Sequence, residues 1–196
     1  MQRELEAFLQ TLDSNMRVFD VELPPDALAR LGTYYSLLTR WNERLHLVAP
    51  CTPEEFATRH VLESLLLLKH LPHGAKIADI GSGAGLPIIP CLIVRDDLEA
   101  TLIESSLKKT VFLREALSAV GRRATIVAQR FEEIEAPPVE FVTSRALDRF
   151  IPQIPSLIDW APDGATLLLF GGESLLNAER HLIPGSEKRY LFVKRK

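Results

Sequence analysis

The chain has little cysteine, only short apolar runs and little net charge, and each shortage removes a class of protein. Two cysteines, Cys51 and Cys91, occur among 196 residues, which is too few for a disulfide framework or a cysteine-based zinc site. Uninterrupted apolar runs, such as residues 65–68, are far shorter than the roughly 20 residues of a membrane helix. Residues 1–6 mix charges and lack the layout of a secretory signal. We therefore expect a protein of the reducing cytoplasm, with no membrane anchor and no bound metal.

Charge is nearly balanced, which argues against a protein that binds nucleic acid through its overall charge. The formal net charge is −3 and the pI is near 6.0, whereas autonomous nucleic-acid binders are usually basic. Basic residues are nevertheless clustered at Lys108-Lys109 and Arg122-Arg123, so a local basic face is compatible with the net sign. The length predicts one compact unit with an N-terminal extension, and we expect a monomer.

Residues 1–72 are expected to form a helical N-terminal extension. Apolar side chains recur there at steps of three and four, a spacing typical of an amphipathic helix; they are Ala27, Leu28, Leu31, Tyr35, Leu38, Trp41 and Leu45. A further helix should begin at Thr52, because Thr52 can cap it and Glu55 completes a capping box, with Pro53 in the first turn. It should end near residues 71–74, where a proline and a glycine follow the leucines.

Residues 73–196 follow a different pattern, in which short apolar runs alternate with helical stretches. The expected strands are residues 77–80, 100–103, 124–127, 141–142, 165–170 and 189–194. The helical stretches between them include residues 87–94, 107–120 and 151–160. This alternation predicts an α/β fold, with a mostly parallel sheet and helices on both of its faces.

A glycine-rich loop follows the first of these strands and is the most informative feature of the sequence. It reads Asp79-Ile80-Gly81-Ser82-Gly83-Ala84-Gly85, an acid followed by three glycines at alternate positions. The dinucleotide-binding fingerprint needs a further glycine where this chain has Leu86. The S-adenosylmethionine (SAM) loop of class I methyltransferases has the form acid-x-Gly-x-Gly-x-Gly, which fits at every position. The loop therefore favours a Rossmann-like class I fold, whose seven-stranded sheet is mostly parallel with an antiparallel tail strand.

Two acids fit the two ends of such a cofactor. Glu104 ends the second expected strand, where a carboxylate can accept both ribose hydroxyls of an adenosine cofactor. Asp79 would lie near the cationic methionine end of SAM and compensate its charge. Backbone amides of the loop and of the next helix N-terminus would meet the cofactor's carboxylate. This arrangement needs neither a metal nor a Walker-type lysine.

Motifs that are missing after the fourth expected strand narrow the choice of atom that receives the methyl group. Enzymes that methylate exocyclic amines of bases usually carry Asn/Asp-Pro-Pro-aromatic there, whereas this chain has Thr143-Ser144-Arg145-Ala146. Methylation of pyrimidine carbon 5 needs a cysteine nucleophile, and neither cysteine lies after that strand. A nitrogen with a free lone pair, such as guanine N7, needs only alignment with the methyl group.

Several further motifs carry a resemblance to a known family. They are residues 79–87 with Leu86-Pro87 after the last glycine, Arg59-His60, Glu63-Ser64-Leu65, Glu104-Ser105, Lys108-Lys109, Phe112-Leu113-Arg114, Arg130-Phe131-Glu132-Glu133 and Ser144-Arg145-Ala146. In these motifs, over about residues 34–172, the chain resembles the RsmG (GidB) methyltransferases. The resemblance implies an enzyme that uses SAM to methylate N7 of a guanine in 16S rRNA of the small ribosomal subunit.

The loop and the resemblance together imply roles for individual residues. Those expected to bind SAM are Asp79, Gly81, Ser82, Gly83, Gly85, Leu86, Glu104, Ser105, Phe131, Glu132 and Arg145. Among them, the resemblance implies that Phe131 and Glu132 frame the adenine. It also implies that Arg145 is the functional arginine beside cofactor and RNA. Lys108 and Lys109 open a helix close to this site, where they would meet RNA phosphate.

Two departures from the family's pattern keep alternatives open. Ile88 stands where the family usually has glycine, and Phe170 stands where it usually has a lysine before the glycine that follows strand five. One alternative is a SAM-dependent methyltransferase of a small molecule, which the acidic pI would suit. The other is a SAM-binding, ribosome-associated module without turnover, which the loss of the lysine would suit.

Overall fold

A seven-stranded sheet organises the computed structural model, which describes residues 2–145 and 151–196. The strand order is β3-β2-β1-β4-β5-β7-β6. Strands β1 to β5 pair in parallel, whereas β7 is antiparallel to both β5 and β6. The strands are β1 Lys76–Ile80, β2 Glu99–Ile103, β3 Thr125–Val127, β4 Phe141–Ser144, β5 Thr166–Gly172, β6 Glu179–Leu182 and β7 Arg189–Arg195. The predicted α/β fold, with a mostly parallel sheet and an antiparallel tail strand, is confirmed.

One strand was not found by the apolar pattern. Strand β6 consists of Glu179-Arg180-His181-Leu182, and all four residues are exposed. It lies at the edge of the sheet and pairs only with β7 among the strands described. An edge strand with two solvated faces needs no apolar alternation, so the sequence carried no signal for it.

The helices lie close to their predicted positions. Their bounds are α1 Gln2–Phe19, α2 Ala27–Leu45, α3 Pro53–Glu55, η1 Phe56–Leu62, α4 Glu63–Leu65, η2 Leu66–His70, α5 Ile88–Val94, α6 Leu107–Ala119, η3 Phe131–Glu133, η5 Ile151–Gln153 and α7 Ile154–Trp160. The predicted capping box is present, since the Glu55 amide donates to Thr52 Oγ1 at 3.1 Å and the Thr52 amide donates to Glu55 Oε2 at 3.2 Å. None of the helices described is both long and apolar enough to cross a bilayer.

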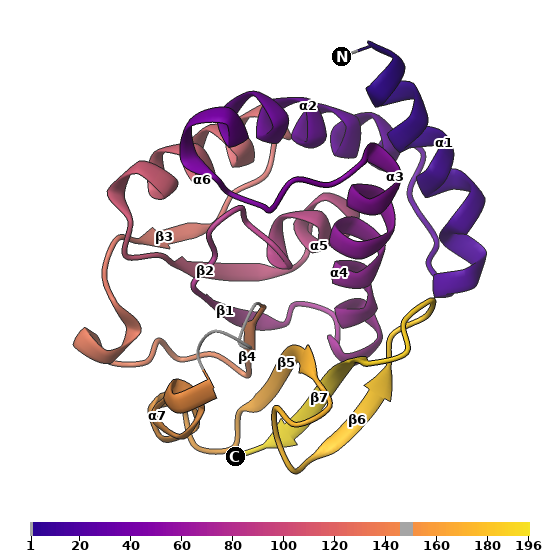
Figure 1. Cartoon of the computed structure of the whole chain (residues 1–196). Coiled ribbons are helices and arrows are strands. Elements are labelled where there is room, and N and C mark those ends of the chain that lie inside the picture. Colours follow the sequence, from indigo (N-terminus) through magenta and orange to yellow (C-terminus); the bar gives the residue numbers. More distant parts are fainter. Residues whose placement is uncertain (1, 146–150) are drawn as a thin grey trace.

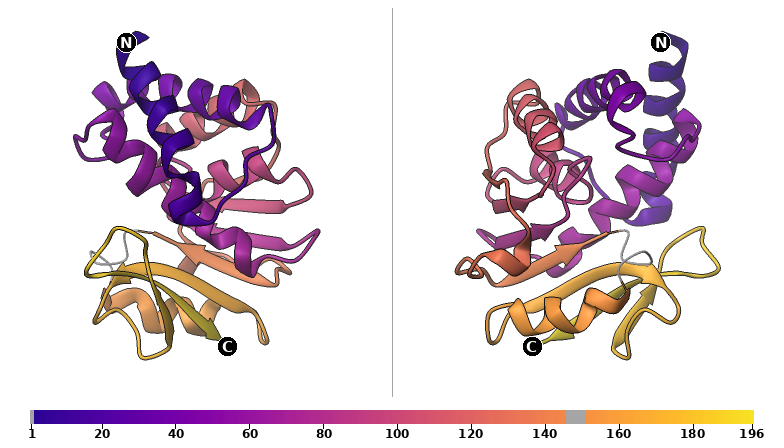
Figure 2. Two further views of the ribbon diagram at one scale, coloured as in Figure 1. Left: turned by 90° about the vertical axis from the view of Figure 1, so that its right-hand side faces the viewer. Right: turned by 60° about the vertical axis from the view of Figure 1, so that its left-hand side comes forward.

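Helices cover the two faces of the sheet unequally (Figures 1 and 2). The N-terminal helices lie with α5 and α6 on one face, and α7 lies on the other. Strand side chains alternate between these layers, so that Ile77 of β1 joins the core under the N-terminal helices and Ala78 joins the core under α7. The N-terminal helices share one hydrophobic core with the sheet, so they pack directly against it. The division of the chain at residue 72 stays a prediction.

Two crossover connections contain little or no helix. Between β3 and β4 the chain forms a single helical turn, η3. Residues 173–178, which join β5 to β6, form no helix, although a parallel crossover usually contains one. Within the described ranges, α7 is therefore the one helix of more than a single turn on its face of the sheet.

Candidate functional site

The glycine-rich loop lies at the carboxyl edge of the sheet, between β1 and α5. Gly81, Gly83 and Gly85 all have positive φ, at 69°, 52° and 80°, which glycine adopts without a steric penalty. The amides of Gly81 and Ser82 donate to the Ile103 carbonyl at 2.9 and 3.2 Å. The loop is thereby tied to the end of β2, the neighbouring strand.

The glycines serve two different purposes. A Cβ on Gly81 would meet no atom within 4 Å, and one on Gly83 would come no nearer than 3.6 Å to another atom, so these two positions leave the loop open to a ligand. A Cβ on Gly85 would lie 2.3 Å from Ile89 Cδ1, so Gly85 lets α5 pack closely on the loop. Ser82 and Leu86 are also buried, and Ser82 Oγ donates to the Asp79 carbonyl at 3.0 Å.

Replacing Gly85 by alanine should therefore destabilise the fold more than the same change at an open glycine. Gly185 is a matched control, because its φ is +73° and a Cβ there meets nothing within 4 Å. We expect Gly85→Ala to lower the free energy of unfolding by about 3 kcal/mol, and Gly185→Ala by about 1 kcal/mol. Urea denaturation measures both; equal losses would show that α5 does not constrain Gly85.

Asp79, at the end of β1, is a buried acid without a partner. Its side chain is completely buried, and neither carboxylate oxygen accepts a hydrogen bond within the described part of the chain. Burial raises the pKa of this carboxyl to about 7, an effect that Ser82 opposes and the nearby Glu104 reinforces. An unpartnered buried acid is costly, and a cationic group bound beside it would remove that cost.

Glu104, directly after β2, is held by two backbone amides. The Gly83 amide donates to Glu104 Oε2 at 2.9 Å, and the Ser106 amide donates to Oε1 at 2.8 Å. The residue is 7% exposed. An ionised carboxylate has about four acceptor positions, so both oxygens can still accept hydroxyl donors from a ligand.

The residues around Glu104 differ in exposure. Ser105 and Lys108 are exposed and Lys109 is half-buried, while Ser106 caps α6 by accepting a hydrogen bond from the Lys109 amide at 3.5 Å. The two lysines therefore lie in the first turn of α6, beside Glu104, and are partly free to meet an anion.

Phe131 and Glu132 form the turn η3 that follows β3. Phe131 is buried, and its ring packs edge-on against Trp160 of α7 with centroids 5.7 Å apart. Glu132 is exposed. Turn η3 therefore places a buried aromatic ring, which packs against α7, next to an exposed carboxylate.

Arg145, the residue after β4, reaches into the N-terminal helices. Its Nη1 donates to the His60 carbonyl at 3.2 Å and its Nη2 donates to the Arg59 carbonyl. Nη2 also lies 3.4 Å from Glu63 Oε2. The side chain is 16% exposed, so most of the guanidinium is occupied by the protein. Ala146 of the Ser144-Arg145-Ala146 motif lies outside the described residues.

Three residues to which the sequence assigned no role, Tyr34, Glu63 and Arg189, lie at this edge of the sheet. Tyr34 of α2 is buried, and its hydroxyl donates to the Ala84 carbonyl within the glycine loop at 2.6 Å. Glu63 is buried and pairs with both Arg145 and Arg189 of β7. Position in the sequence gave no hint of these contacts, because they join segments far apart in the chain; only the residue type of Glu63, an acid within a leucine-rich helix, was a signal.

His60 contacts Arg145 through its backbone carbonyl and not through its ring. Burial, together with the positive charges of Arg145, Arg59 and Arg189, lowers the pKa of His60 to about 3. The ring is therefore neutral at pH 7, and it packs against Phe56 at a centroid distance of 5.1 Å. Its buried Nδ1 has no hydrogen-bond partner within the described residues.

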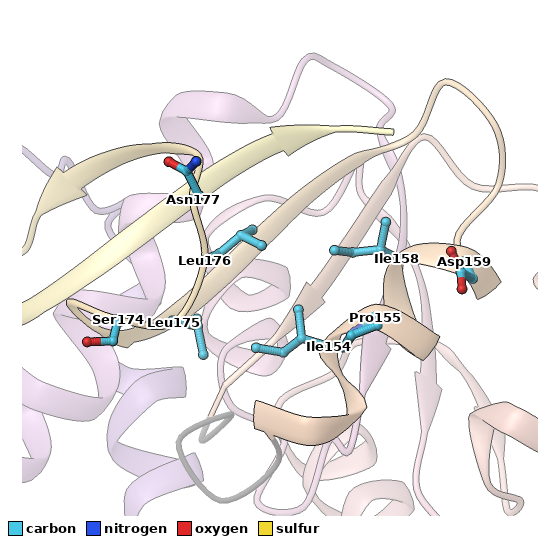
Figure 3. Close-up of a pocket in the computed structure, with 8 residues that line it drawn as sticks. All are labelled: Ile154, Pro155, Ile158, Asp159, Ser174, Leu175, Leu176 and Asn177. Carbon is cyan, nitrogen blue, oxygen red and sulfur yellow. The ribbon is translucent and has the colours of Figure 1, made fainter.

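The surface has a hollow of about 470 Å³ (Figure 3). It is formed by α7 and by residues 173–178, and it contains none of the predicted site residues. The residues that line it are Ile154, Pro155, Ile158, Asp159, Ser174, Leu175, Leu176 and Asn177. Leu176 and Ile158 point toward one another across it, while Ser174 and Asn177 point outward. The glycine loop, Asp79 and Glu104 therefore do not line this hollow.

Comparison with known proteins agrees with the geometry. The sequence model of the GidB family, described as rRNA small subunit methyltransferase G, matches residues 27–182. A ribosomal RNA small subunit methyltransferase G from Halorhodospira halophila is 40% identical over 164 residues, covering 82% of this chain and 77% of the relative. One from Sorangium cellulosum is 35% identical over 186 residues, covering 89% and 77%.

Solved structures with a similar fold include two methyltransferases. One from Pyrococcus furiosus superposes with a TM-score of 0.59 at 11% identity, covering 85% of this chain and 98% of its own. A SAM-dependent methyltransferase from Aquifex aeolicus superposes with a TM-score of 0.58 at 11% identity, covering 82% and 97%. At such identities the likeness shows a shared fold alone.

Proposed function

The chain belongs to the rRNA small subunit methyltransferase G family, and we propose that it methylates N7 of a guanine in 16S rRNA. It is a SAM-dependent methyltransferase, and SAM supplies an electrophilic methyl group. The single observation that carries the assignment of the site is the pair of acids, Asp79 and Glu104, on either side of an open glycine loop. We expect the protein to act as a monomer in the cytoplasm, where its substrate is made.

The residues at the glycine loop fit SAM. Asp79 is a buried carboxylate that accepts no hydrogen bond from the residues the structure describes, which suits the cationic end of the cofactor. Glu104 keeps acceptor positions for the two ribose hydroxyls, and Gly81 leaves the loop surface open. Phe131 offers an apolar surface for the adenine, and Glu132 beside it an acceptor. Ser82, Gly85 and Leu86 shape the loop from within, since all three are buried.

The proposed target atom needs little from the protein beyond alignment. The N7 lone pair of guanine is free, so neither a general base nor a covalent nucleophile is required. His60 is neutral and packed, and the buried Cys91 donates its thiol hydrogen to the Ser64 carbonyl at 3.3 Å. Arg145, Lys108 and Lys109 carry positive charge at the carboxyl edge and would position the RNA through its phosphates or guanine O6.

The raised pKa of Asp79 predicts a pH dependence of SAM binding. Without SAM the carboxyl titrates near pH 7; a bound cation favours the ionised form and lowers this pKa, so binding below pH 7 releases a proton. SAM affinity should therefore rise by close to tenfold per pH unit between about pH 5 and 6, and the rise should level off as the pH passes 7. Calorimetry in two buffers of different ionisation enthalpy measures the released proton. Asp79→Asn should bind weakly and without this slope, and a flat profile in the wild type would show that Asp79 does not meet the cation.

The function itself is tested by offering the enzyme three acceptors. SAM labelled in its methyl group is incubated with small ribosomal subunits, with naked 16S rRNA and with a metabolite extract. We expect label in RNA, and the ratio between subunits and naked RNA identifies the form that is recognised. Label in metabolites alone would favour the small-molecule alternative. SAM binding without label in any acceptor would favour the module without turnover.

A further inference from the structure

A buried carboxylate lies between two arginines behind the proposed site. The side chain of Glu63 is 3% exposed. Its Oε1 lies 2.5 Å from Arg189 Nη1, and its Oε2 lies 3.4 Å from Arg145 Nη2. Glu63 comes from α4, Arg189 from β7, and Arg145 directly follows β4, so the cluster joins the N-terminal helices to the sheet.

The helix that carries Glu63 is widened where Arg145 meets it. Segment η1 is π-helical, and the Glu63 amide bonds to the Thr58 carbonyl, five residues back. The carbonyls of Arg59 and His60 in this segment accept hydrogen bonds from Arg145. Wide turns of this kind leave carbonyl groups to be satisfied by other donors, and they are frequent at functional sites.

Contacts with three residues of the described chain fix the guanidinium of Arg145. Nη1 is held by His60, and Nη2 by Arg59 and Glu63. The Phe170 ring lies beneath, with its centroid 6.0 Å from the Arg145 guanidinium carbon. An arginine has five N–H groups, and these hydrogen bonds use three.

Stability alone is a weak reason for this cluster. Replacing a buried ion pair by packed apolar residues is often neutral or stabilising, so the charges are better explained by what they orient. Glu63 pairs with two cations, Arg145 and Arg189, whereas the ion-pair partner of Arg145 in the described residues is Glu63, which it shares with Arg189. Arg189 therefore compensates the negative charge of Glu63, and the contact between Glu63 and Arg145 can orient the Arg145 guanidinium.

We propose that Glu63 is a positioning residue for methyl transfer: it aims the guanidinium of Arg145 at a phosphate or carbonyl oxygen of the RNA, and Arg189 keeps the buried carboxylate balanced. The proposal rests on the proposed function, since it needs an RNA acceptor. It also gives the N-terminal helices a part in catalysis, because Arg59, His60 and Glu63 all come from them.

The test is Glu63→Gln, with Glu54→Gln as the matched control. Glu54 is an exposed acid on the same helical segment and touches none of the cluster. We expect Glu63→Gln to lower kcat/KM for small ribosomal subunits at least tenfold, while the dissociation constant for SAM changes less than twofold. Glu54→Gln should match the wild type in both. A Glu63→Gln enzyme with wild-type kcat/KM would overturn the proposal.

A double-mutant cycle separates positioning from a merely structural role. In an Arg145→Ala background there is no guanidinium for Glu63 to orient, so adding Glu63→Gln should change kcat/KM less than twofold. A further tenfold loss would show that Glu63 acts independently of Arg145 and would overturn the proposal.

If Glu63→Gln does not fold, Glu63→Asp keeps the charge but shortens the reach by one methylene. It should retain a wild-type SAM affinity and lose at least fivefold in kcat/KM, and unchanged kcat/KM would contradict the proposal. Failure of the proposed function is recognised separately, because the wild type would then transfer no methyl group to RNA.

Discussion

Glu104→Ala is expected to weaken SAM binding by about 2–4 kcal/mol, or roughly 30- to 1,000-fold. Two effects add. The ribose hydroxyls lose a charged acceptor, and the Gly83 and Ser106 amides, which Glu104 now holds at 2.9 and 2.8 Å, lose theirs. The glycine loop and the start of α6 are then no longer held together from one side chain, so the site loses preorganisation as well as contacts.

Calorimetric titration with SAM measures this loss, and Glu115→Ala is its control. Glu115 is an exposed acid on α6, distant in sequence from the glycine loop and its neighbours, and its removal should leave SAM affinity within twofold of the wild type. The SAM affinity of Glu104→Gln should lie between those of Glu104→Ala and Glu115→Ala, because glutamine keeps the size of the side chain but offers only one acceptor oxygen. Unchanged affinity in Glu104→Ala, or tighter binding of NAD than of SAM, would contradict the assignment of the ribose site.

Arg145→Ala is expected to lower methylation at least tenfold and also to destabilise the fold by about 2–3 kcal/mol. The structural cost arises because Glu63 Oε2 and the carbonyls of Arg59 and His60 all lose the donor that Arg145 provides. The role beside cofactor and RNA that the resemblance implies for Arg145 accounts for the loss of methylation. The ion pair with Glu63 shows that a stability cost must be expected with it.

Rates must therefore be normalised to folded protein, measured by urea denaturation of the same samples. Arg145→Lys should recover only part of the rate, since lysine keeps the charge but lacks the planar fork that reaches several acceptors at once. Arg145→Ala enzyme that is folded and methylates small subunits at the wild-type rate would remove Arg145 from the site.

The sheet was predictable because its strands carry local signals. Strand β1 is mostly apolar and carries an acid, Asp79, just before the glycine loop, and Glu104 directly follows β2; both patterns have a physical reason that one sequence can reveal. Helix α6 begins at Leu107, as its pattern indicated. Strand β6 escaped because it is short, polar and exposed.

The environment of the proposed site was not predictable in the same way. The partners of Arg145 lie about 85 residues away in sequence, and periodicity says nothing about such pairings. The separate roles of Gly81 and Gly85 also depend on packing, because only the position of Ile89 distinguishes an open glycine from a crowded one. Local rules therefore predicted which residues gather at the edge, and tertiary contacts decided how each is held.

The most direct measurement identifies the methylated nucleoside. Small ribosomal subunits are incubated with the wild-type protein and SAM, their 16S rRNA is digested to nucleosides, and the products are separated by chromatography and mass spectrometry. We predict 7-methylguanosine approaching one per subunit, and none with protein omitted. A methyl group on any other atom, or RNA that gains no methyl group while SAM binds normally, would contradict guanine N7 methylation as the function of this protein.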